Sequence, residues 1–97
     1  MNRSAVLDTL AAQKAKIRES FGVKYLGLFG SAARDDMRPD SDVDLLVEFS
    51  QSPTFDTYVE LQSYLERILN TKVDLVTVGG LKPRARSLVE RDLIRVA

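Results

Sequence analysis

Two aspartates, Asp42 and Asp44, lie two residues apart at the start of the apolar run Val43–Phe49. Successive side chains of an extended strand alternate between its faces, so these two carboxylates are predicted to share one face. Two ionised carboxylates side by side repel each other unless a cation lies between them. Such oxygen ligands suit Mg²⁺, which takes one or two carboxylates together with substrate phosphates. The pair therefore predicts a magnesium site.

A Gly-Ser pair, Gly30 and Ser31, directly follows the apolar run Lys24–Phe29, and ten residues separate it from Asp42. A side chain at Gly30 would block the approach of a phosphate to the backbone. If a short helix begins here, its N–H groups and dipole favour an anion, and the Ser31 hydroxyl can join them. The alternative is a glycine that ends a strand and a serine that caps a helix. The downstream aspartates favour phosphate binding, and a phosphate site beside a metal site indicates chemistry on a nucleotide.

A third acid, Asp74, lies in the apolar run Lys72–Val78, which is predicted to be a strand. A carboxylate buried alone is costly, so Asp74 needs a partner or a metal ion. If this strand pairs with Val43–Phe49, Asp74 can reach the same metal as the first two acids. The alternative is an exposed charge on an edge strand, or a salt bridge to an arginine.

This set of residues resembles the nucleotidyltransferase superfamily related to DNA polymerase beta, and in particular its minimal members, the MNT-domain proteins. The residues that carry the pattern GSxAR…SDxDLLV are Gly30, Ser31, Ala33, Arg34, Ser41, Asp42, Asp44, Leu45, Leu46 and Val47. The resemblance implies that Asp42, Asp44 and Asp74 are catalytic carboxylates that bind one or two Mg²⁺ ions. It also implies nucleotide binding by Gly30, Ser31 and Arg34.

The resemblance further implies transfer of AMP from ATP to a hydroxyl. Minimal nucleotidyltransferases are commonly antitoxins paired with a HEPN-domain toxin, and some add AMP to a tyrosine of that toxin. We therefore expect a protein adenylyltransferase that acts as an antitoxin. The alternatives are an antitoxin that neutralises its partner by contact alone and a nucleotidyltransferase that modifies a small molecule.

Four further positions bear on the expected site. Arg34 is expected either to neutralise triphosphate charge or to pair with an acidic residue that fixes the loop, and the sequence does not choose between these roles. Many relatives carry Arg where this chain has Ala32, and Gly where it has Asp35. The lost positive charge and the added negative one are expected to weaken phosphate binding. Ser41 is expected to orient the loop before Asp42.

The composition narrows the possible classes of protein. The chain has 97 residues, enough for one domain over residues 1–97, and 44% of them are hydrophobic, as in globular proteins. Lys plus Arg equals Asp plus Glu at 14 each, which does not favour a general nucleic-acid binder. With no cysteine and no histidine, disulfides, thiolate zinc sites and imidazole bases are excluded. No apolar run reaches membrane-spanning length and no signal peptide is evident, so we expect a cytoplasmic location.

Hydrophobic periodicity predicts the order helix, strand, short helix, strand, helix, strand, helix. The first helix is expected from Ser4 to about Ser20 with Ser4 as its N-cap, and Ala11 is among the residues that recur at helical spacing on its buried stripe. A second is expected from about Asp56 to Leu69, with Asn70 at its end, and a third from Pro83 to about Arg91. The buried stripe of the second helix is predicted to consist of Tyr58, Leu61, Leu65 and Ile68. The segment Leu93–Val96 is expected to be a short strand.

These elements predict an α/β (α+β) fold, with a small mixed sheet and helices packed mainly on one face. It agrees with the nucleotidyltransferase fold that the resemblance implies. Five basic residues gather near the C-terminus and are interpreted as a solvated helix face: Lys82, Arg84, Arg86, Arg91 and Arg95.

Overall fold

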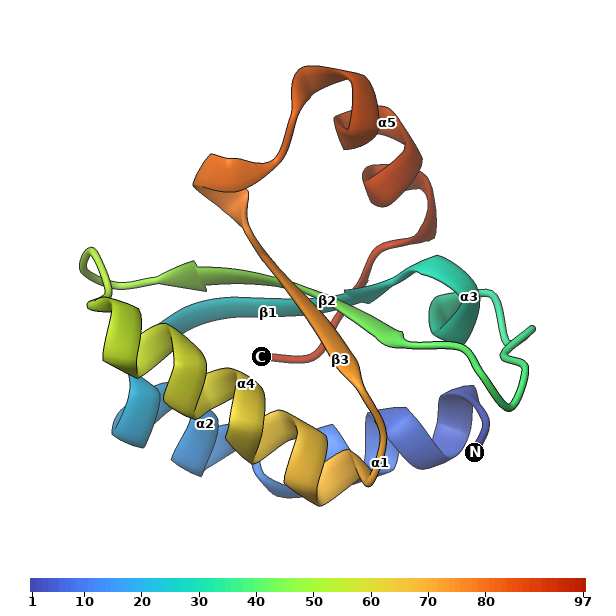
Figure 1. The fold of residues 1–97 in the computed structure, drawn as a ribbon, viewed down its shortest axis with the longest axis horizontal. Helices are drawn as coiled ribbons and strands as arrows, with labels where there is room; N and C mark the ends of the chain where they lie inside the picture. The colour runs from blue at the N-terminus through green and yellow to red at the C-terminus, as the bar shows by residue number, and fades with distance from the viewer.

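The computed structural model describes residues 1–97, which form a four-stranded mixed sheet with helices on both sides (Figure 1). The strands, in the sheet order β3-β2-β1-β4, are β3 (Val73–Thr77), β2 (Val43–Phe49), β1 (Val23–Phe29) and β4 (Ile94–Arg95). β2 is parallel to β3, whereas β1 is antiparallel to both β2 and β4. A parallel pair needs a crossover connection, which helix α4 (Phe55–Leu69) supplies. The predicted fold class is confirmed.

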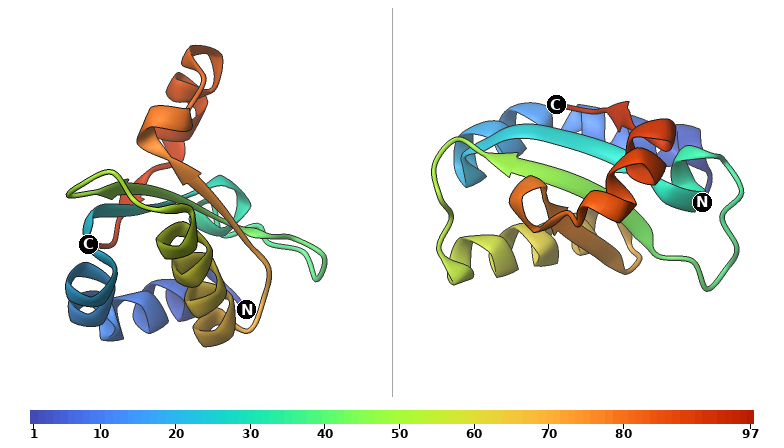
Figure 2. Two further views of the ribbon diagram at one scale, coloured as in Figure 1. Left: turned by 60° about the vertical axis from the view of Figure 1, so that its left-hand side comes forward. Right: turned by 90° about the horizontal axis from the view of Figure 1, so that it is seen from above.

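Three helices cover one face of the sheet: α1 (Arg3–Ala12), α2 (Lys14–Phe21) and α4 (Figures 1 and 2). The short helix α3 (Gly30–Ala33) follows β1 at one end of the sheet. Helix α5 (Pro83–Asp92) lies beyond the opposite face, and the single 3₁₀ turn η1 (Val78–Gly80) leads to it from β3. The face opposite the main helix layer is therefore only partly covered.

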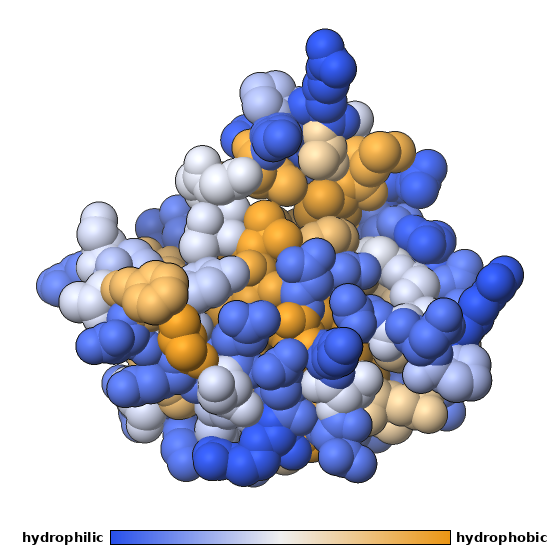
Figure 3. Space-filling model, viewed as in Figure 1, coloured by the Kyte–Doolittle hydropathy of each residue, from blue (hydrophilic) through white to orange (hydrophobic).

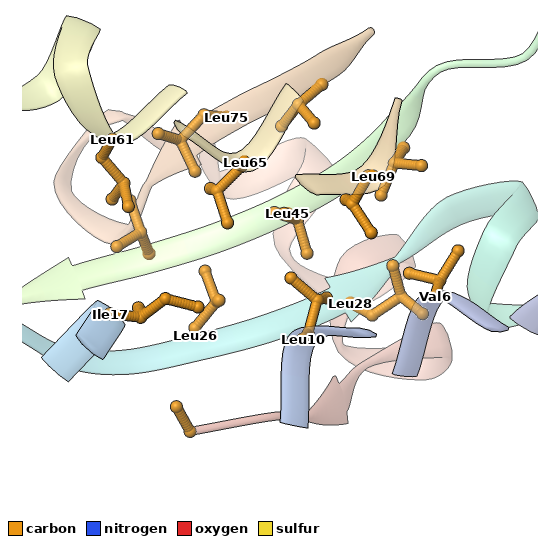
Figure 4. Close-up of a cluster of buried hydrophobic side chains, with 14 of the residues drawn as sticks. Val6, Leu10, Ile17, Leu26, Leu28, Leu45, Leu61, Leu65, Leu69 and Leu75 are labelled. Atoms are coloured by element: carbon orange, nitrogen blue, oxygen red, sulfur yellow. The ribbon is translucent and has the colours of Figure 1, made fainter. Parts of the chain in front are cut away.

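The main hydrophobic core lies between the sheet and α1, α2 and α4. Alternate residues of β2, namely Val43, Leu45 and Val47, are fully buried there. Figure 4 shows side chains of the strands and of the three helices pointing toward one another around Leu45. Full burial of one such side chain stabilises the fold by about 1.5–3 kcal/mol. The core thus fixes which face of β2 each residue occupies.

The first helix differs from the prediction at its start. The N-cap is Asn2, whose side chain accepts a hydrogen bond from the Ala5 N–H at 2.9 Å, and Ser4 lies inside α1. Asparagine and serine are similarly good caps, so local preference alone does not select between them. Ala11, expected on the buried stripe, is exposed.

The same segment is also two helices rather than one. Gln13 leaves the helical conformation, with φ −107° and ψ 11°, and separates α1 from α2. Its side-chain oxygen accepts a hydrogen bond from the Tyr64 hydroxyl of α4 at 2.9 Å. This tertiary contact accompanies a bend that buries both Leu10 and Ile17 against the sheet.

The remaining elements follow the prediction closely. Helix α4 begins one residue earlier than expected, after the N-cap Thr54, and ends at Asn70 in the left-handed conformation. Its buried stripe includes Tyr64 and Leu69, which the prediction omitted. The short C-terminal strand β4 is present and pairs with β1.

Apolar and polar side chains are unevenly distributed over the surface. In Figure 3, apolar side chains gather around η1 and α5, whereas polar ones dominate the lower part of this view. Leu88 of α5 is 57% exposed. The five basic residues near the C-terminus are all exposed as predicted, but only Arg84, Arg86 and Arg91 lie on a helix. None of the helices combines the length and the apolar character that crossing a lipid bilayer requires.

Candidate active site

Asp44 of β2 and Asp74 of β3 are partners in the register of the parallel pair. Register partners on neighbouring strands direct their side chains to the same face of the sheet. That face is the one opposite the main core, because Val43 and Leu45 on either side of Asp44 face the core. The structure therefore brings together the acid of β2 and the acid of β3, which lie 30 positions apart in the chain.

Asp42 completes the acidic group from just outside the sheet. It is exposed and directly precedes β2, so it lies at the end of a loop rather than on a strand. The prediction that strand alternation places Asp42 on the same face as Asp44 therefore does not apply, because Asp42 is not part of β2. Asp42 is nonetheless close enough for its charge to act on the carboxyl of Asp44.

The carboxyl of Asp44 is half-buried, and its pKa is raised from 3.8 to about 6. Burial is the largest cause, because it disfavours the charged form, and the carboxylates of Asp74 and Asp42 follow in that order. The charge of Arg34 opposes these effects without cancelling them. The site thus carries more negative charge than the protein itself compensates.

Gly30 is the first residue of α3 and lies against Asp44. It has φ +73°, and a Cβ atom at this position would overlap the Asp44 carboxylate. Glycine is required here for two reasons, the left-handed backbone and the nearby acid. From the sequence, glycine was expected here so that a phosphate could approach the backbone. In the structure, glycine is also needed to leave room for the Asp44 carboxylate, whether or not a ligand is bound. The predicted short helix after β1 is confirmed, with Ser31 in its first turn.

Arg34 pairs with acidic side chains. Its guanidinium lies 2.6 Å from a carboxylate oxygen of Asp92 in α5 and 3.5 Å from one of Asp36. Of the two roles left open by the sequence, loop-fixing is the one present in this structure. The ion pair ties the loop after α3 to the end of α5, and it keeps one positive charge near Asp44.

The two departures from the family pattern lie away from the acids. Asp35 has φ +61°, a conformation that glycine adopts freely and that Asp tolerates better than most residues. Its carboxylate accepts a hydrogen bond from the Arg3 N–H at the start of α1, at 2.9 Å. Ala32 is fully buried in the core. Neither side chain faces the acidic group. The positions of Ala32 and Asp35 therefore do not support the expectation that these two residues weaken phosphate binding directly.

The loop before the acids is closed by Ser41. Its hydroxyl accepts a hydrogen bond from the Arg38 N–H at 2.9 Å, and its own N–H donates to the Arg38 carbonyl. Ser41 therefore orients the loop that ends at Asp42, as the sequence indicated.

The carboxylates of the site suit Mg²⁺ if water and substrate phosphates supply its remaining ligands. No group of three or more His, Cys, Asp or Glu side chains is arranged to hold a metal ion by itself. Mg²⁺ typically takes only one or two protein carboxylates and completes its shell with water and substrate phosphates. The uncompensated charge around Asp44 fits a divalent cation of that kind, with Asp42, Asp44 and Asp74 as the candidate ligands.

The fold and the acidic group together define a nucleotidyltransferase. The nucleotidyltransferase domain family matches residues 10–96, and the chain belongs to this family. It is 42% identical over 87 residues to the protein adenylyltransferase MntA of Thermococcus cleftensis, covering 90% of this chain and 88% of the relative. It is 40% identical over 94 residues to a Methanocaldococcus jannaschii protein that is assigned the same activity, covering 96% of both chains.

Solved structures share this architecture. A protein assigned as a minimal nucleotidyltransferase superposes with a TM-score of 0.81 at 35% identity, covering 97% of this chain and 95% of that one. The complex of a tri-AMPylated HEPN toxin with an MNT antitoxin from Shewanella oneidensis gives a TM-score of 0.68 at 18% identity, with 94% and 71% coverage. At that identity the second likeness concerns the fold alone.

Sequence reasoning missed two contributors to the site. Asp92, the partner of Arg34, lies 58 positions away and no local pattern marks it. Tyr58 of α4 was assigned to the buried stripe, but its hydroxyl donates a hydrogen bond to the Leu75 carbonyl beside Asp74. Its spacing of four residues from Gln62 offered a signal, because both side chains share one side of the helix.

Proposed function

We propose that this chain is a magnesium-dependent enzyme that transfers AMP from ATP to a hydroxyl group of a partner protein. The register pairing of Asp44 with Asp74, with Asp42 beside them, carries the proposal. The similarity to a protein adenylyltransferase over 90% of this chain supports the nature of the transferred group and of the acceptor.

In the proposed reaction, the acceptor oxygen attacks the α-phosphorus of ATP. The bond from that phosphorus to the oxygen that bridges the α- and β-phosphates breaks, and pyrophosphate leaves. Bound Mg²⁺ would neutralise phosphate charge and align the reacting oxygens. Asp42 and Asp44 would hold the ion on the nucleotide, and Asp74 would orient the acceptor hydroxyl and accept its proton. The N–H groups around Gly30 and Ser31 would position the phosphates.

Arg34 has a different role from the acids in this scheme. Its guanidinium is engaged by Asp92 and Asp36, but it remains exposed and close enough to lower the pKa of Asp44. We infer that it supports nucleotide binding by fixing the loop and by adding positive charge at short range. A direct contact with a phosphate would require it to leave Asp92.

The proposed acceptor is a tyrosine hydroxyl of a HEPN-domain toxin, which makes this chain an antitoxin. Support comes from solved toxin–antitoxin complexes that share the fold, one of them with AMP-PNP at a TM-score of 0.74 and 20% identity. The test is incubation of the chain with labelled ATP, Mg²⁺ and a HEPN-domain protein, if one is encoded beside it. Label on a tyrosine of that protein is expected, and absence of label while the toxin is still inhibited would reject the enzymatic account.

A contact-only antitoxin is the second candidate, because Arg34 is paired within the protein and no three acids form a metal site by themselves. Replacement of Asp42 and Asp44 by Asn separates the candidates. A catalyst loses neutralisation of the toxin, whereas a protein that acts by contact retains it.

A further inference from the structure

Strand β3 carries Asp74 but lies at the edge of the sheet, with β2 on one side only. Backbone N–H and C=O groups on the open side of an edge strand lack a strand partner. The Val43 N–H of β2 donates to the Lys72 carbonyl, so the groups of Val73 and Leu75 point away from β2. Water or side chains must satisfy these groups in place of a strand.

Helix α4 supplies partners for three of these four groups with a row of three polar side chains. The Glu66 carboxylate accepts a hydrogen bond from the Val73 N–H at 3.0 Å, and the Gln62 side-chain amide donates to the Val73 carbonyl at 3.0 Å. The Tyr58 hydroxyl donates to the Leu75 carbonyl. Tyr58, Gln62 and Glu66 are spaced by four residues, so they lie along one side of the helix and run beside the strand.

The residue between the two anchored positions is Asp74. Its own side chain is exposed, and none of the three ion pairs of the protein involves it. Its place opposite Asp44 therefore depends on the backbone of β3. That backbone is held by β2 on one side and by the α4 row on the other.

We propose that Tyr58, Gln62 and Glu66 are positioning residues that hold β3 in place and so keep Asp74 in register with Asp44. The consequence for catalysis rests on the function proposed above, whereas the consequence for β3 does not. The row takes the place of a further strand along the open edge. It links the geometry of the acidic group to α4, which lies in the main core layer.

The electrostatics of Tyr58 are consistent with this arrangement. Burial raises the pKa of its hydroxyl, and the carboxylate of Asp74 raises it further. Both effects keep the hydroxyl protonated, so it remains a hydrogen-bond donor.

The first experiment compares Tyr58→Phe with Tyr64→Phe. Each variant loses one hydroxyl hydrogen bond of α4, but Tyr64 bonds to Gln13 in the helix layer, away from β3. Amide exchange measured by NMR is expected to accelerate about 10-fold across Val73–Thr77 in Tyr58→Phe only. The Mg²⁺ concentration for half-maximal AMP transfer is expected to rise about 10-fold in the same variant, as for other groups that orient metal ligands.

The second experiment compares Glu66→Ala with Glu60→Ala, an exposed glutamate of the same helix. Faster exchange at the Val73 N–H is expected in Glu66→Ala only. Glu66→Gln keeps an acceptor oxygen and is expected to restore both slow exchange and the magnesium dependence.

Equal exchange in the Tyr58 and Tyr64 variants would overturn the proposal. So would faster exchange of β3 together with an unchanged magnesium dependence. If the wild-type chain transfers no AMP, the proposed function fails. In that case, the amide exchange rates of β3 and the chemical shift of the Asp74 amide still decide whether Tyr58, Gln62 and Glu66 hold β3.

Discussion

Burial has opposite effects on the apolar side chains of one face of β2 and on the acid of the other. On one face Val43, Leu45 and Val47 are fully buried among apolar side chains, and each gains stability from leaving water. On the other face the half-buried Asp44 lies beside Asp74 and Asp42, and its pKa of about 6 shows that its charged form is disfavoured there. The charged form of Asp44 therefore acts against the fold, whereas its neighbours Val43 and Leu45 stabilise it. The difference supports the proposed binding role of the acidic group, because that group does not stabilise the fold.

The largest expected effect is on activity. Replacement of Asp42 or Asp44 by Asn should reduce AMP transfer about 1000-fold, equivalent to about 4 kcal/mol, because each removes a candidate metal ligand. The thermal midpoint of the metal-free protein should stay the same or rise. Initial rates with labelled ATP and a melting curve measure the two effects. A large drop in the melting temperature would show that the acids support folding, which contradicts the comparison.

The next effect concerns stability on the core face. Leu45→Ala should reduce the free energy of unfolding by about 3 kcal/mol, because it leaves a cavity in the main core. Leu46, the next residue, is 6% exposed and lies on the acidic face outside the main core cluster. Leu46→Ala should therefore cost less, about 2 kcal/mol. Chemical denaturation of both variants measures the difference, and equal losses would remove the distinction between the faces.

Substitution of Gly30 tests how closely the backbone approaches the acidic face. Gly30→Ala should reduce the free energy of unfolding by about 2 kcal/mol, because its left-handed φ and the nearby Asp44 both oppose a Cβ. Gly79→Ala is the control, since a Cβ there meets nothing within 4 Å. Thermal denaturation of the pair measures the effect. A neutral Gly30→Ala would mean that Asp44 moves away freely.

The smallest expected effect is the pH dependence of stability. Asp44 has a pKa of about 6 in the folded protein and an ordinary value of 3.8 in the unfolded chain, so between these values the folded state binds more protons than the unfolded state. Its contribution to stability therefore falls as pH rises from about 4 to about 6, by about 1 kcal/mol once solvent screening of a half-exposed group is considered. Denaturation of metal-free protein across this range, compared with Asp44→Asn, measures the contribution. An identical pH dependence in both would contradict the raised pKa.

Most of the site could be predicted because its residues lie close together in the sequence. The alternation of β2 gave the side of Asp44 correctly, since burial of Val43 and Leu45 leaves it no other face. The Gly-Ser pair opened a helix as expected. The pairing of Arg34 with Asp92 could not be predicted, because it joins elements separated by most of the chain.

The errors in the fold have a similar origin. Helical periodicity favoured one N-terminal helix, and the break at Gln13 coincides with a hydrogen bond to Tyr64 from another helix. Local preference also allowed Ser4 as a cap when Asn2 takes that place. Strand alternation put Asp42 on β2, but this residue lies just outside the strand, because an alternating pattern does not mark where a strand begins.

The sequence by itself determined the apolar strand with one acid in it and one directly before it, the preceding glycine, and the order of elements apart from the division of the first helix, because these depend on local spacing and conformational preference. Only the tertiary structure decided that Asp74 stands opposite Asp44, that Arg34 binds Asp92, and that α4 secures the open edge of β3. Those features depend on which segments pack together. That packing follows from burial of the whole core rather than from any one stretch of the chain.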